Sequence, residues 1–503
     1  MKLVSKTRFF QYLECPKDAW YRLYIPDLPE FEISETTQAI MDQGKEVEEY
    51  AKKLKIFTGF VEIKSRGFSE FKKEIDGFIS KKTSVVYQPS FIADGFMIRC
   101  DFILWNSKTG KWDLYEVKGT NSMKDNDGPR DHITDLTFQT VVLERYEIDL
   151  GSKYLVHLNN EYIRGEELSI ESLFTIEDCT EQVDLKREIV VEQMEHAKKY
   201  LNQEKEPRRG CNCHLFGRSR HCATFQKSHP EIPEYSVHDI TRIGSSHGKL
   251  EKLIEDGIYF LHKIEDTSDF SIPQQNQIHA HKTGEEIIDK QEITKILDSY
   301  TYPLYFFDYE TFSPAIPIYT GYGTWQRIPI QFSLHVIDEK EGELRHLEYL
   351  QEKNSDPSED VAKKLIELID PRGTIIAWNY GFEKSVTAEI GERLPQYKEV
   401  LDRICGQMKD LMEIFSKQHY VHKDFKGRAK IESVMNVLLP EMTYDNLPYT
   451  GEVVGYVWWQ DIVNTGAEPE ERAKKIHLIK EYCKQDTLVM VEIFRILNNI
   501  IKK

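Results

Sequence analysis

The sequence predicts an α/β protein of two domains joined by a small helical connector. Its 503 residues exceed what one hydrophobic core usually serves, so length alone indicates more than one domain. Strand-like and helical patterns alternate in both halves of the chain, and the stretch between them has short helical signals interrupted by glycine. We therefore expect a first domain over residues 1–225, a connector over 226–300 and a second domain over 301–503.

The chain is acidic, since 84 Asp and Glu residues oppose 66 Lys and Arg residues and give a net charge of −18. This charge argues against a protein that coats DNA with a uniformly basic surface. It leaves room for a nuclease, whose carboxylates need metal ions and whose substrate contacts form a local basic strip. No apolar run is long enough to span a membrane, and the N-terminus lacks a signal-peptide core. The sequence thus predicts a cytoplasmic protein.

The expected second domain begins with a strand pattern that carries two acids. In the run PLYFFDYETF, Asp308 and Glu310 share one face of the strand, while Phe307 and Tyr309 face the other side. Two carboxylates this close repel each other unless a cation lies between them, and Mg²⁺ or Mn²⁺ is the usual solution. The pair predicts a divalent-metal site. Solvated acids at this spacing are the alternative.

Two later segments add candidate ligands. The apolar pattern GTIIAWN ends at Asn379, and Glu383 follows where a helix is expected to begin; Asp410 is a second candidate for the same role. Near the C-terminus, KEYCKQDTLVM places Tyr482 and Asp486 four residues apart, on one face of a predicted helix.

These three segments, taken in order, resemble the motifs of the DEDDy exonucleases, which have an RNase H-like fold. Those enzymes carry Asp-x-Glu on the first strand, then Asn-x-x-Phe-Asp, then Tyr-x-x-x-Asp on a late helix; here Glu383 stands where an aspartate is usual. The resemblance implies that Asp308, Glu310 and Asp486 bind two Mg²⁺ or Mn²⁺ ions. It also implies 3′ to 5′ degradation of nucleic acid, with Tyr482 orienting the attacking water.

In the expected first domain, RCDFILWNSKTGKWDLYEVKG reads as two strands joined by the turn NSKTGK. Asp101 interrupts the apolar run of the first strand, while Glu116 and Lys118 share a face of the second, opposite Tyr115 and Val117. The hairpin would place Asp101 beside this pair. Two carboxylates can hold Mg²⁺, and a lysine can stabilise developing charge. A cross-strand ion pair on the surface is the alternative interpretation.

This arrangement resembles the PD-(D/E)XK fold, and in particular the RecB-like nucleases. Gln139, in DLTFQTVVLERY, matches the glutamine that follows the Glu-x-Lys strand in those enzymes. Glu48, in QGKEVEEYAKK, stands where an early helix supplies an acidic metal ligand. Many members also have a histidine in that helix, whereas this chain has Val47. The resemblance implies a second metal-dependent nuclease site.

Four of the eight cysteines are distributed as one early and three late residues around these motifs: Cys15, Cys211, Cys213 and Cys222. In a reducing cytosol, clustered cysteines are better explained by metal ligation than by disulfides. Some RecB-like nucleases bind a [4Fe–4S] cluster with this distribution of thiolates, and the resemblance implies one here. A Zn²⁺ site that uses His214 or His221, and free thiols, are the alternatives.

The cysteine-rich segment is also basic, and its cations are Arg208, Arg209, Arg218 and Arg220. They are candidates for contacts with nucleic-acid phosphates, although a solvated loop would have the same composition.

The whole chain resembles members of a bacterial family that fuses a RecB-like nuclease half to an RNase H-like exonuclease half; PLYFFDYETF, IPIQFSLHV and LLPEMTYDNL carry this resemblance. It implies a metal-dependent exonuclease acting on DNA or RNA, single-stranded or with free ends, in DNA repair or defence. The alternatives are a nucleic-acid-binding scaffold with one or both sites degenerate, favoured by Val47 and Glu383, and a hydrolase of small phosphoesters.

Overall fold

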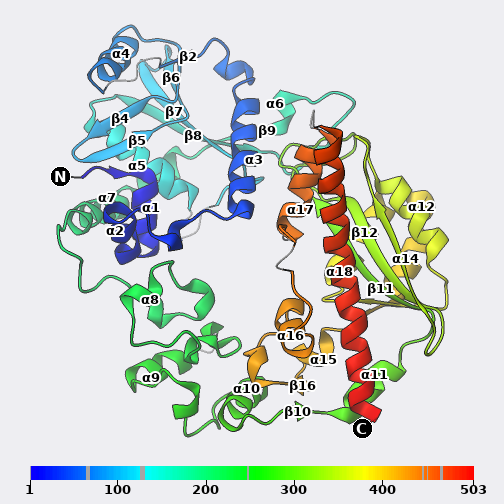
Figure 1. Ribbon diagram of the computed structural model, residues 1–503. Helices are drawn as coiled ribbons and strands as arrows, with labels where there is room; N and C mark the ends of the chain where they lie inside the picture. The colour runs from blue at the N-terminus through cyan, green and yellow to red at the C-terminus, as the bar shows by residue number, and fades with distance from the viewer. Residues whose placement is uncertain are drawn as a thin grey trace. The chain divides into compact units, whose positions relative to one another are not determined.

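The computed structural model describes residues 2–63, 68–124, 131–245, 248–444, 447–449, 451–464 and 468–502. The chain forms two compact units, both of which mix helices and sheets, so the predicted α/β class is confirmed (Figure 1). Unit 1 comprises Met1–Glu231 and Pro314–Gln326, and unit 2 comprises Ile232–Ser313 and Arg327–Lys503. Most of the segment expected to be a connector therefore belongs to unit 2.

Unit 1 contains a six-stranded sheet of order β2-β3-β6-β7-β8-β9 and a three-stranded sheet of order β1-β5-β4. The strands are β1 (Val4–Ser5), β2 (Val61–Glu62), β3 (Val85–Tyr87), β4 (Ser90–Ala93), β5 (Phe96–Arg99), β6 (Phe102–Asn106), β7 (Lys111–Lys118), β8 (Leu150–Leu158) and β9 (Phe174–Asp178). The helices are α1 (Lys6–Glu14), α2 (Pro16–Tyr24), α3 (Glu35–Ala51), α4 (Phe68–Ser80), α5 (His132–Arg145), α6 (Ile170–Leu173), α7 (Thr180–Leu201) and α8 (Phe225–Ser228).

Helix α5 connects two parallel strands of the larger sheet. The predicted hairpin of β6 and β7 is antiparallel, whereas β7 pairs with β8 in parallel, and parallel neighbours need a crossover connection. Asp131 begins the helix, because its side chain accepts a hydrogen bond from the Ile133 N–H group. Residues His132 to Leu143 of α5 are all buried, so its polar side chains need partners inside the unit.

The two faces of the six-stranded sheet pack against different helices. Leu114 of β7 belongs to the core that contains α5 and α7, and the next residue, Tyr115, belongs to the core that contains α3. By the alternation of strand side chains, Glu116 and Lys118 lie on the α5 side; the sequence predicted that they share a face, opposite Tyr115 and Val117.

The run GFMIRCDFILWN (95–106), which has the strand-like pattern of one continuous element, forms two strands in different sheets. Strand β5 pairs with β1 and β4, whereas β6 pairs with β3 and β7. Asp101 lies at the junction, where its backbone oxygen accepts from Gln88 N (2.8 Å) and its Oδ2 accepts from Val117 N (2.7 Å). The expectation that Asp101 lies within a strand was therefore wrong, because its carboxylate binds a neighbouring strand's backbone at the point where the chain changes sheet.

Unit 2 contains a five-stranded sheet of order β13-β12-β11-β14-β15 and a two-stranded sheet of β10 and β16. The strands are β10 (Ile287–Ile288), β11 (Leu304–Phe312), β12 (Ile328–Ile337), β13 (Leu344–Leu350), β14 (Thr374–Ala377), β15 (Met408–Asp410) and β16 (Tyr420–Val421). The helices are α9 (Lys249–Glu255), α10 (Ile272–Thr283), α11 (Lys290–Asp298), α12 (Ser358–Leu368), α13 (Gly381–Arg393), α14 (Lys398–Gln407), α15 (Glu413–Ser416), α16 (Ile431–Leu438), α17 (Gly451–Val457) and α18 (Pro469–Lys502).

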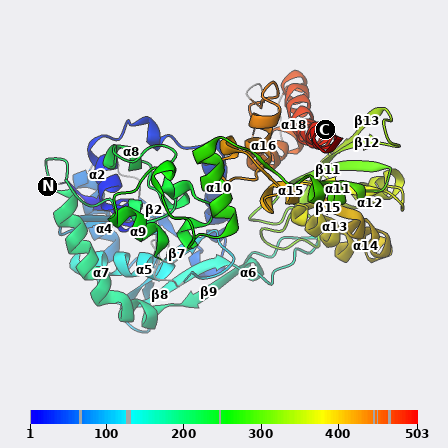
Figure 2. The ribbon, with the colours of Figure 1, turned by 90° about the horizontal axis from the view of Figure 1, so that it is seen from below.

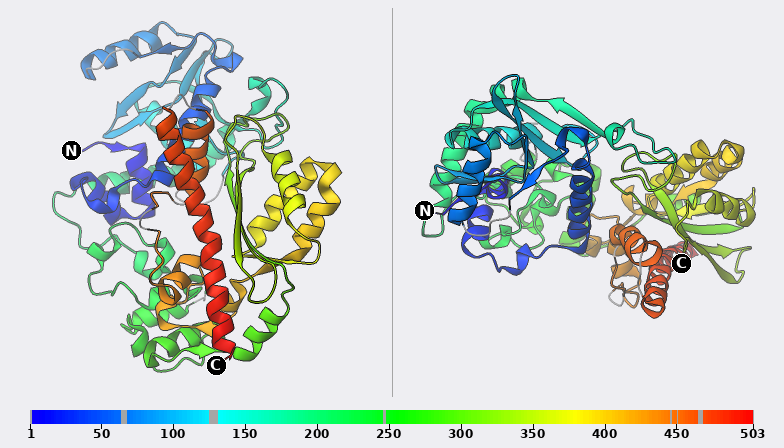
Figure 3. Two further views of the ribbon diagram at one scale, coloured as in Figure 1. Left: turned by 45° about the vertical axis from the view of Figure 1, so that its right-hand side comes forward. Right: turned by 90° about the horizontal axis from the view of Figure 1, so that it is seen from above.

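Strand β11 is central in this sheet, antiparallel to β12 and parallel to β14. Helices cover both faces: α12, α13 and α14 lie on one side, and α16 and α18 lie on the other (Figure 2). Phe306 packs on the α18 side, while Phe307 and Tyr309 pack on the opposite side, as the alternation predicted. Asp308 and Glu310 therefore face α18, which runs along the sheet (Figure 3).

Helix α17 approaches the end of β11 closely. A Cβ atom at Gly455 would collide with the carbonyl oxygen of Thr311, so only glycine permits this packing. The first residue of α17, Gly451, lies next to Glu310 of β11 and the Tyr482 hydroxyl of α18.

The helical stretch at the start of unit 2 has a small apolar core of its own, formed by Val237, Ile240, Ile243, Leu250, Leu253, Leu261, Ile264 and Ile278. No helix in the described ranges combines the length and the apolar composition needed to cross a membrane.

Candidate functional sites

The first candidate site lies between β11 and α18 in unit 2. Ligand atoms of Asp308, Glu310 and Cys483 all lie within 4.8 Å of one another. The Cys483 thiol is 3.5 Å from Oδ2 of Asp308, toward which it donates. The predicted pair of acids thus meets a third potential ligand, Cys483, from a helix that begins more than 150 residues later in the chain.

The carboxylates of this site repel one another. Burial, and then the charge of Glu383, raises the pKa of Asp308 well above its ordinary value. Burial, Asp308 and Asp486 do the same for the pKa of Glu310, and burial and Asp308 do so for Asp486. Across the described residues, no Lys, Arg or His side chain forms an ion pair with any of these acids. The site concentrates negative charge without a protein cation to balance it.

Glu383 contributes a buried oxygen that is unpaired. Its side chain lies in the first turn of α13, is 3% exposed, and has no hydrogen-bond partner for Oε2 within the described part of the chain. Burial, and then the charge of Asp410, raises the pKa of Glu383 to about 8. Asp410 itself is engaged elsewhere, since its Oδ1 accepts from the backbone N–H groups of Asn379 (2.9 Å) and Met412 (3.0 Å). Glu383 is therefore better placed than Asp410 as a ligand.

Tyr482 and Asp486 lie one turn apart on α18, as expected. The Tyr482 hydroxyl oxygen accepts a hydrogen bond from Gly451 N (3.0 Å), which leaves its proton available to another acceptor. Burial, Asp486 and Glu310 raise the pKa of Tyr482, so the hydroxyl lies within the field of these acids. Asp486 accepts a hydrogen bond from the Tyr444 hydroxyl, a partner that the sequence did not suggest.

The second candidate site lies in unit 1, between β7, α5 and α1. The Oε1 atom of Glu116 is 2.7 Å from Nζ of Lys118 and 2.6 Å from Nζ of Lys6, and Oε2 accepts from Gln139 Nε2 (2.8 Å). Asp135 binds the same two lysines and the same Gln139 amide. The structure therefore brings Glu116, Lys118 and Gln139 together and adds two residues that the sequence did not single out.

The sequence pattern could have indicated one of these two additional residues, Asp135, but not the other, Lys6. Asp135 precedes Gln139 by four residues in α5, so the spacing that places Gln139 also places Asp135 on the same face of the helix. Nothing in the sequence pattern pointed to Lys6, which reaches the site from the first helix. Burial lowers the pKa of Lys6, but the charges of Asp135 and Glu116 outweigh this effect and raise the pKa well above its ordinary value.

Asp101 and Glu48 lie beside this ion-pair network. Burial, and then the charge of Glu116, raises the pKa of Asp101 well above its ordinary value, and Glu48 adds to the increase. Glu48 Oε1 accepts from the Tyr87 hydroxyl (2.7 Å) and from Gln88 Nε2 (2.5 Å). The charges of Glu116 and Glu48 both act on Asp101, but the ligand atoms of these three acids do not form a cluster as tight as that of Asp308 and Glu310.

The four cysteines singled out in the sequence converge in unit 1. Their Sγ atoms lie within 4.8 Å of one another, those of Cys211 and Cys222 are 3.7 Å apart, and neither His214 nor His221 belongs to the group. A single tetrahedral ion with metal–sulfur bonds of about 2.3 Å places its thiolates roughly 3.8 Å apart. The thiolates of a four-iron cluster bind different corners of the cluster and lie further apart. The donor set fits a metal centre, and its spacing fits one ion best.

The predicted arginines lie around this cysteine group. Arg208, Arg209 and Arg220 are exposed, and Arg218 is half-buried. Arg220 stacks over the Phe216 ring, with 3.9 Å from its guanidinium carbon to the ring centre.

Comparison with known proteins gives a family match without an activity. Residues 305–430 match a family model described as a domain of unknown function (DUF2779). That segment includes Asp308, Glu310 and Glu383 and ends before α18. The chain is also 25% identical to "Uncharacterized protein MG366" of Mycoplasma genitalium over 217 residues, which cover 39% of this chain and 32% of that protein. The match thus spans about a third of the relative's length.

Proposed function

We propose that the chain is a metal-dependent nuclease with two sites, a DEDDy exonuclease site of RNase H-like type in unit 2 and a RecB-like PD-(D/E)XK site in unit 1. The substrate is DNA or RNA, single-stranded or with free ends. The unit 2 site would remove nucleotides in the 3′ to 5′ direction.

One observation carries the proposal: the carboxylates of unit 2 are gathered without a cation. Asp308, Glu310, Glu383 and Asp486 come from three separate elements, and like charges so placed are costly unless divalent ions neutralise them. The unpaired Oε2 of Glu383 adds a free ligand atom. Hard carboxylate oxygens of this kind suit Mg²⁺ and Mn²⁺.

The side chains have distinct tasks in this proposal. Asp308, Glu310 and Asp486 would hold two divalent ions, which supply charge neutralisation of the phosphodiester and acidity for the attacking water. Tyr482, whose hydroxyl is positioned by the Gly451 N–H group, would donate a hydrogen bond to that water and so orient it, while the water's own proton leaves to solvent.

A test of the unit 2 site requires that any nuclease activity of unit 1 be removed first. In the full chain carrying Asp101→Asn, Mg²⁺-dependent release of nucleotides from the 3′ end of a 5′-labelled single strand should be lost on adding Asp308→Asn. A matched control is Asp298→Asn, which changes an exposed acid in α11. Equal rates in the Asp308→Asn variant and its parent would reject the assignment.

A second candidate function concerns unit 1 alone. Glu116 and Asp135 are already neutralised by Lys6 and Lys118, which favours a nucleic-acid-binding unit that does not cleave. In the Asp308→Asn chain, cleavage that depends on Asp101 would support the nuclease. Binding without cleavage would support the scaffold.

We also propose that Cys15, Cys211, Cys213 and Cys222 hold a metal centre. The resemblance to RecB-like nucleases supports a [4Fe–4S] cluster, while the sulfur separations support one Zn²⁺ ion. Either occupant would link the start of the chain to the segment 211–222 and so restrict the unfolded chain.

A further inference from the structure

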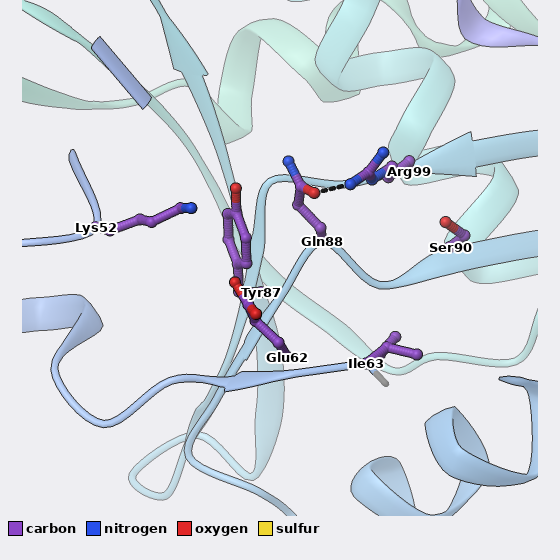
Figure 4. A pocket seen from close by; sticks show the side chains of 7 residues that line it. All are labelled: Lys52, Glu62, Ile63, Tyr87, Gln88, Ser90 and Arg99. Atoms are coloured by element: carbon purple, nitrogen blue, oxygen red, sulfur yellow. Dashed lines mark hydrogen bonds between the residues drawn. The ribbon is translucent and has the colours of Figure 1, made fainter. Parts of the chain in front are cut away.

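A cavity of about 500 Å³ opens in unit 1 beside the residues that hold Glu48 and Asp101. Figure 4 shows the seven side chains that line it. They come from the end of α3 and from the ends of neighbouring strands in both sheets of the unit. The volume lies within the range of roughly 300–1,000 Å³ that is typical of small-molecule and cofactor sites.

The cavity shares its wall with the candidate nuclease site. Tyr87 and Gln88 line it, and both donate hydrogen bonds to Oε1 of Glu48. Gln88 also donates its backbone N–H to the carbonyl oxygen of Asp101 (2.8 Å). A group bound in the cavity would therefore lie next to the residues that contact the Glu48 carboxylate and the backbone of Asp101.

Two cations flank this wall. Figure 4 shows the Lys52 ammonium pointing toward the Tyr87 ring on one side and the Arg99 guanidinium bound to the Gln88 side-chain oxygen on the other. Lys52 lies 4.2 Å from the centre of the Tyr87 ring and also pairs with exposed Glu49. Glu62 is the one acid among the seven lining side chains, against the two cations Lys52 and Arg99.

Gln88 has an unusual backbone conformation at the wall between the two cations. Its φ of 48° is in the left-handed region, which a residue with a long side chain rarely adopts. The conformation lets one side chain bind Glu48 through its nitrogen and Arg99 through its oxygen. Backbone strain of this kind is concentrated at functional sites.

We propose that this cavity binds two successive phosphates of the nucleic-acid strand next to the phosphodiester at Asp101 and Glu116, with Lys52 as the cationic partner of one and Arg99 as that of the other. The inference rests on the proposed function, since it names a substrate-binding part of the unit 1 site. Arginine is suited to phosphate oxygens because its fork donates two parallel hydrogen bonds, and lysine adds a point charge. The acidic chain would thus bind its polyanionic substrate through a local basic site.

The experiment uses the full chain carrying Asp308→Asn, with Lys52→Gln, Arg99→Gln and the double variant added. Binding of a labelled single-stranded oligonucleotide is measured by fluorescence anisotropy over a series of salt concentrations, with Ca²⁺ replacing Mg²⁺. Lys45→Gln is the matched control, because Lys45 is an exposed lysine on the same helix, α3, outside the cavity. Arg99→Lys tests whether charge alone restores binding.

We expect the double variant to bind about tenfold to a hundredfold more weakly than the control, and the slope of log affinity against log salt to fall by about 1.4, the value for two phosphate contacts on a single strand. Arg99→Lys should recover part of the affinity. If all variants keep the affinity and slope of Lys45→Gln while Asp101-dependent cleavage persists, the inference is wrong and the nuclease assignment stands. Weakened binding in a chain that never cleaves would keep the phosphate site and reject the nuclease. A parent chain that does not bind the strand would reject both.

Discussion

The Nζ atom of Lys118 lies 2.7 Å from Oε1 of Glu116, so the acid of the unit 1 site is already paired with a protein cation. Asp308 and Glu310 of unit 2 have no such partner among the described residues. A divalent ion would therefore meet different charges in the two sites. In unit 1 an ion competes with lysines, whereas in unit 2 it relieves repulsion between acids.

Lys6→Met should destabilise unit 1 because Lys6 contacts both Glu116 (2.6 Å) and Asp135 (3.1 Å), which are almost completely buried. Removing one partner of a buried polar group leaves a desolvation penalty of about 1–3 kcal/mol, and more when the group is charged. The measurement is thermal unfolding of the full chain with and without Mn²⁺. Mn²⁺ should recover more stability in Lys6→Met than in Lys45→Met, which removes an exposed lysine. An unchanged melting temperature in Lys6→Met would show that the network contributes nothing to stability.

Metal binding at unit 2 should depend on pH in a defined direction. The pKa of Glu383 is raised to about 8, and those of Asp308 and Glu310 are raised well above their ordinary values. A raised folded-state pKa contributes stability below the unfolded value of about 4, and this contribution is lost as pH rises through the folded value. The metal-free protein should therefore lose stability as the pH rises from roughly 4 to 8. The stability that Mn²⁺ restores should be greatest near pH 8.

The increase in melting temperature caused by Mn²⁺ at each pH tests this expectation. Asp308→Asn should reduce the increase, because it removes a ligand and part of the repulsion. An increase that is the same at low and high pH, or the same in Asp308→Asn, would mean that Mn²⁺ binds elsewhere.

Tyr482→Phe should slow the removal of nucleotides from the 3′ end, through a lower kcat, without removing metal-dependent stabilisation. The change deletes the hydroxyl that Gly451 N positions and that would orient the water, and such groups contribute about 10²–10⁴-fold. Nucleotide release in the Asp101→Asn chain gives kcat and KM separately. Tyr444→Phe is the comparison, because its hydroxyl donates to Asp486 and should affect metal binding as well. A Tyr482→Phe chain that loses Mn²⁺ stabilisation would indicate a structural role instead.

The sequence predicted the strands and helices that carry most of the candidate residues, because their periodicity is a local property. Asp308, Glu310, Glu116 and Lys118 all lie on the strand faces that alternation assigned. The break at Asp101 was missed, because an apolar run gives no sign of where a chain passes from one sheet to another. It depends on hydrogen bonds to Gln88 and Val117 that exist only in the folded protein.

The sequence pattern also could not predict the side chains that distant elements bring to the two sites. Cys483 stands between Tyr482 and Lys484, and only the packing of α18 on β11 turns its thiol toward Asp308. Lys6 reaches Glu116 because α1 packs into the core formed by α5 and the sheet. These contacts depend on tertiary packing, which residue spacing does not encode.

His335→Gln should make the stability of unit 2 less sensitive to acid. His335 is buried, its Nδ1 bonds the Thr487 hydroxyl, and burial and the neighbouring His346 lower its pKa to about 3. A histidine with a depressed pKa contributes stability above its unfolded value of about 6.5, and loses it at about 1.4 kcal/mol for each unit as pH falls toward 3. The free energy of unfolding, measured with urea at several pH values between these limits, should fall less steeply with decreasing pH in the variant. An identical slope would mean that the imidazole is protonated in the folded protein.

Cys222→Ser should remove metal from unit 1 and lower its melting temperature, since the thiol belongs to the group that ties Cys15 to the segment 211–222. Loss of this link frees a loop of most of the unit in the unfolded state. Anaerobic purification followed by iron and zinc analysis, with absorbance at roughly 400 nm as the sign of iron–thiolate charge transfer, identifies the occupant. Cys405→Ser is the control, because that buried thiol lies outside the group. One zinc per chain would agree with the sulfur spacing and four irons with the cluster, whereas a parent chain without either metal would leave the four thiols as a structural cluster only.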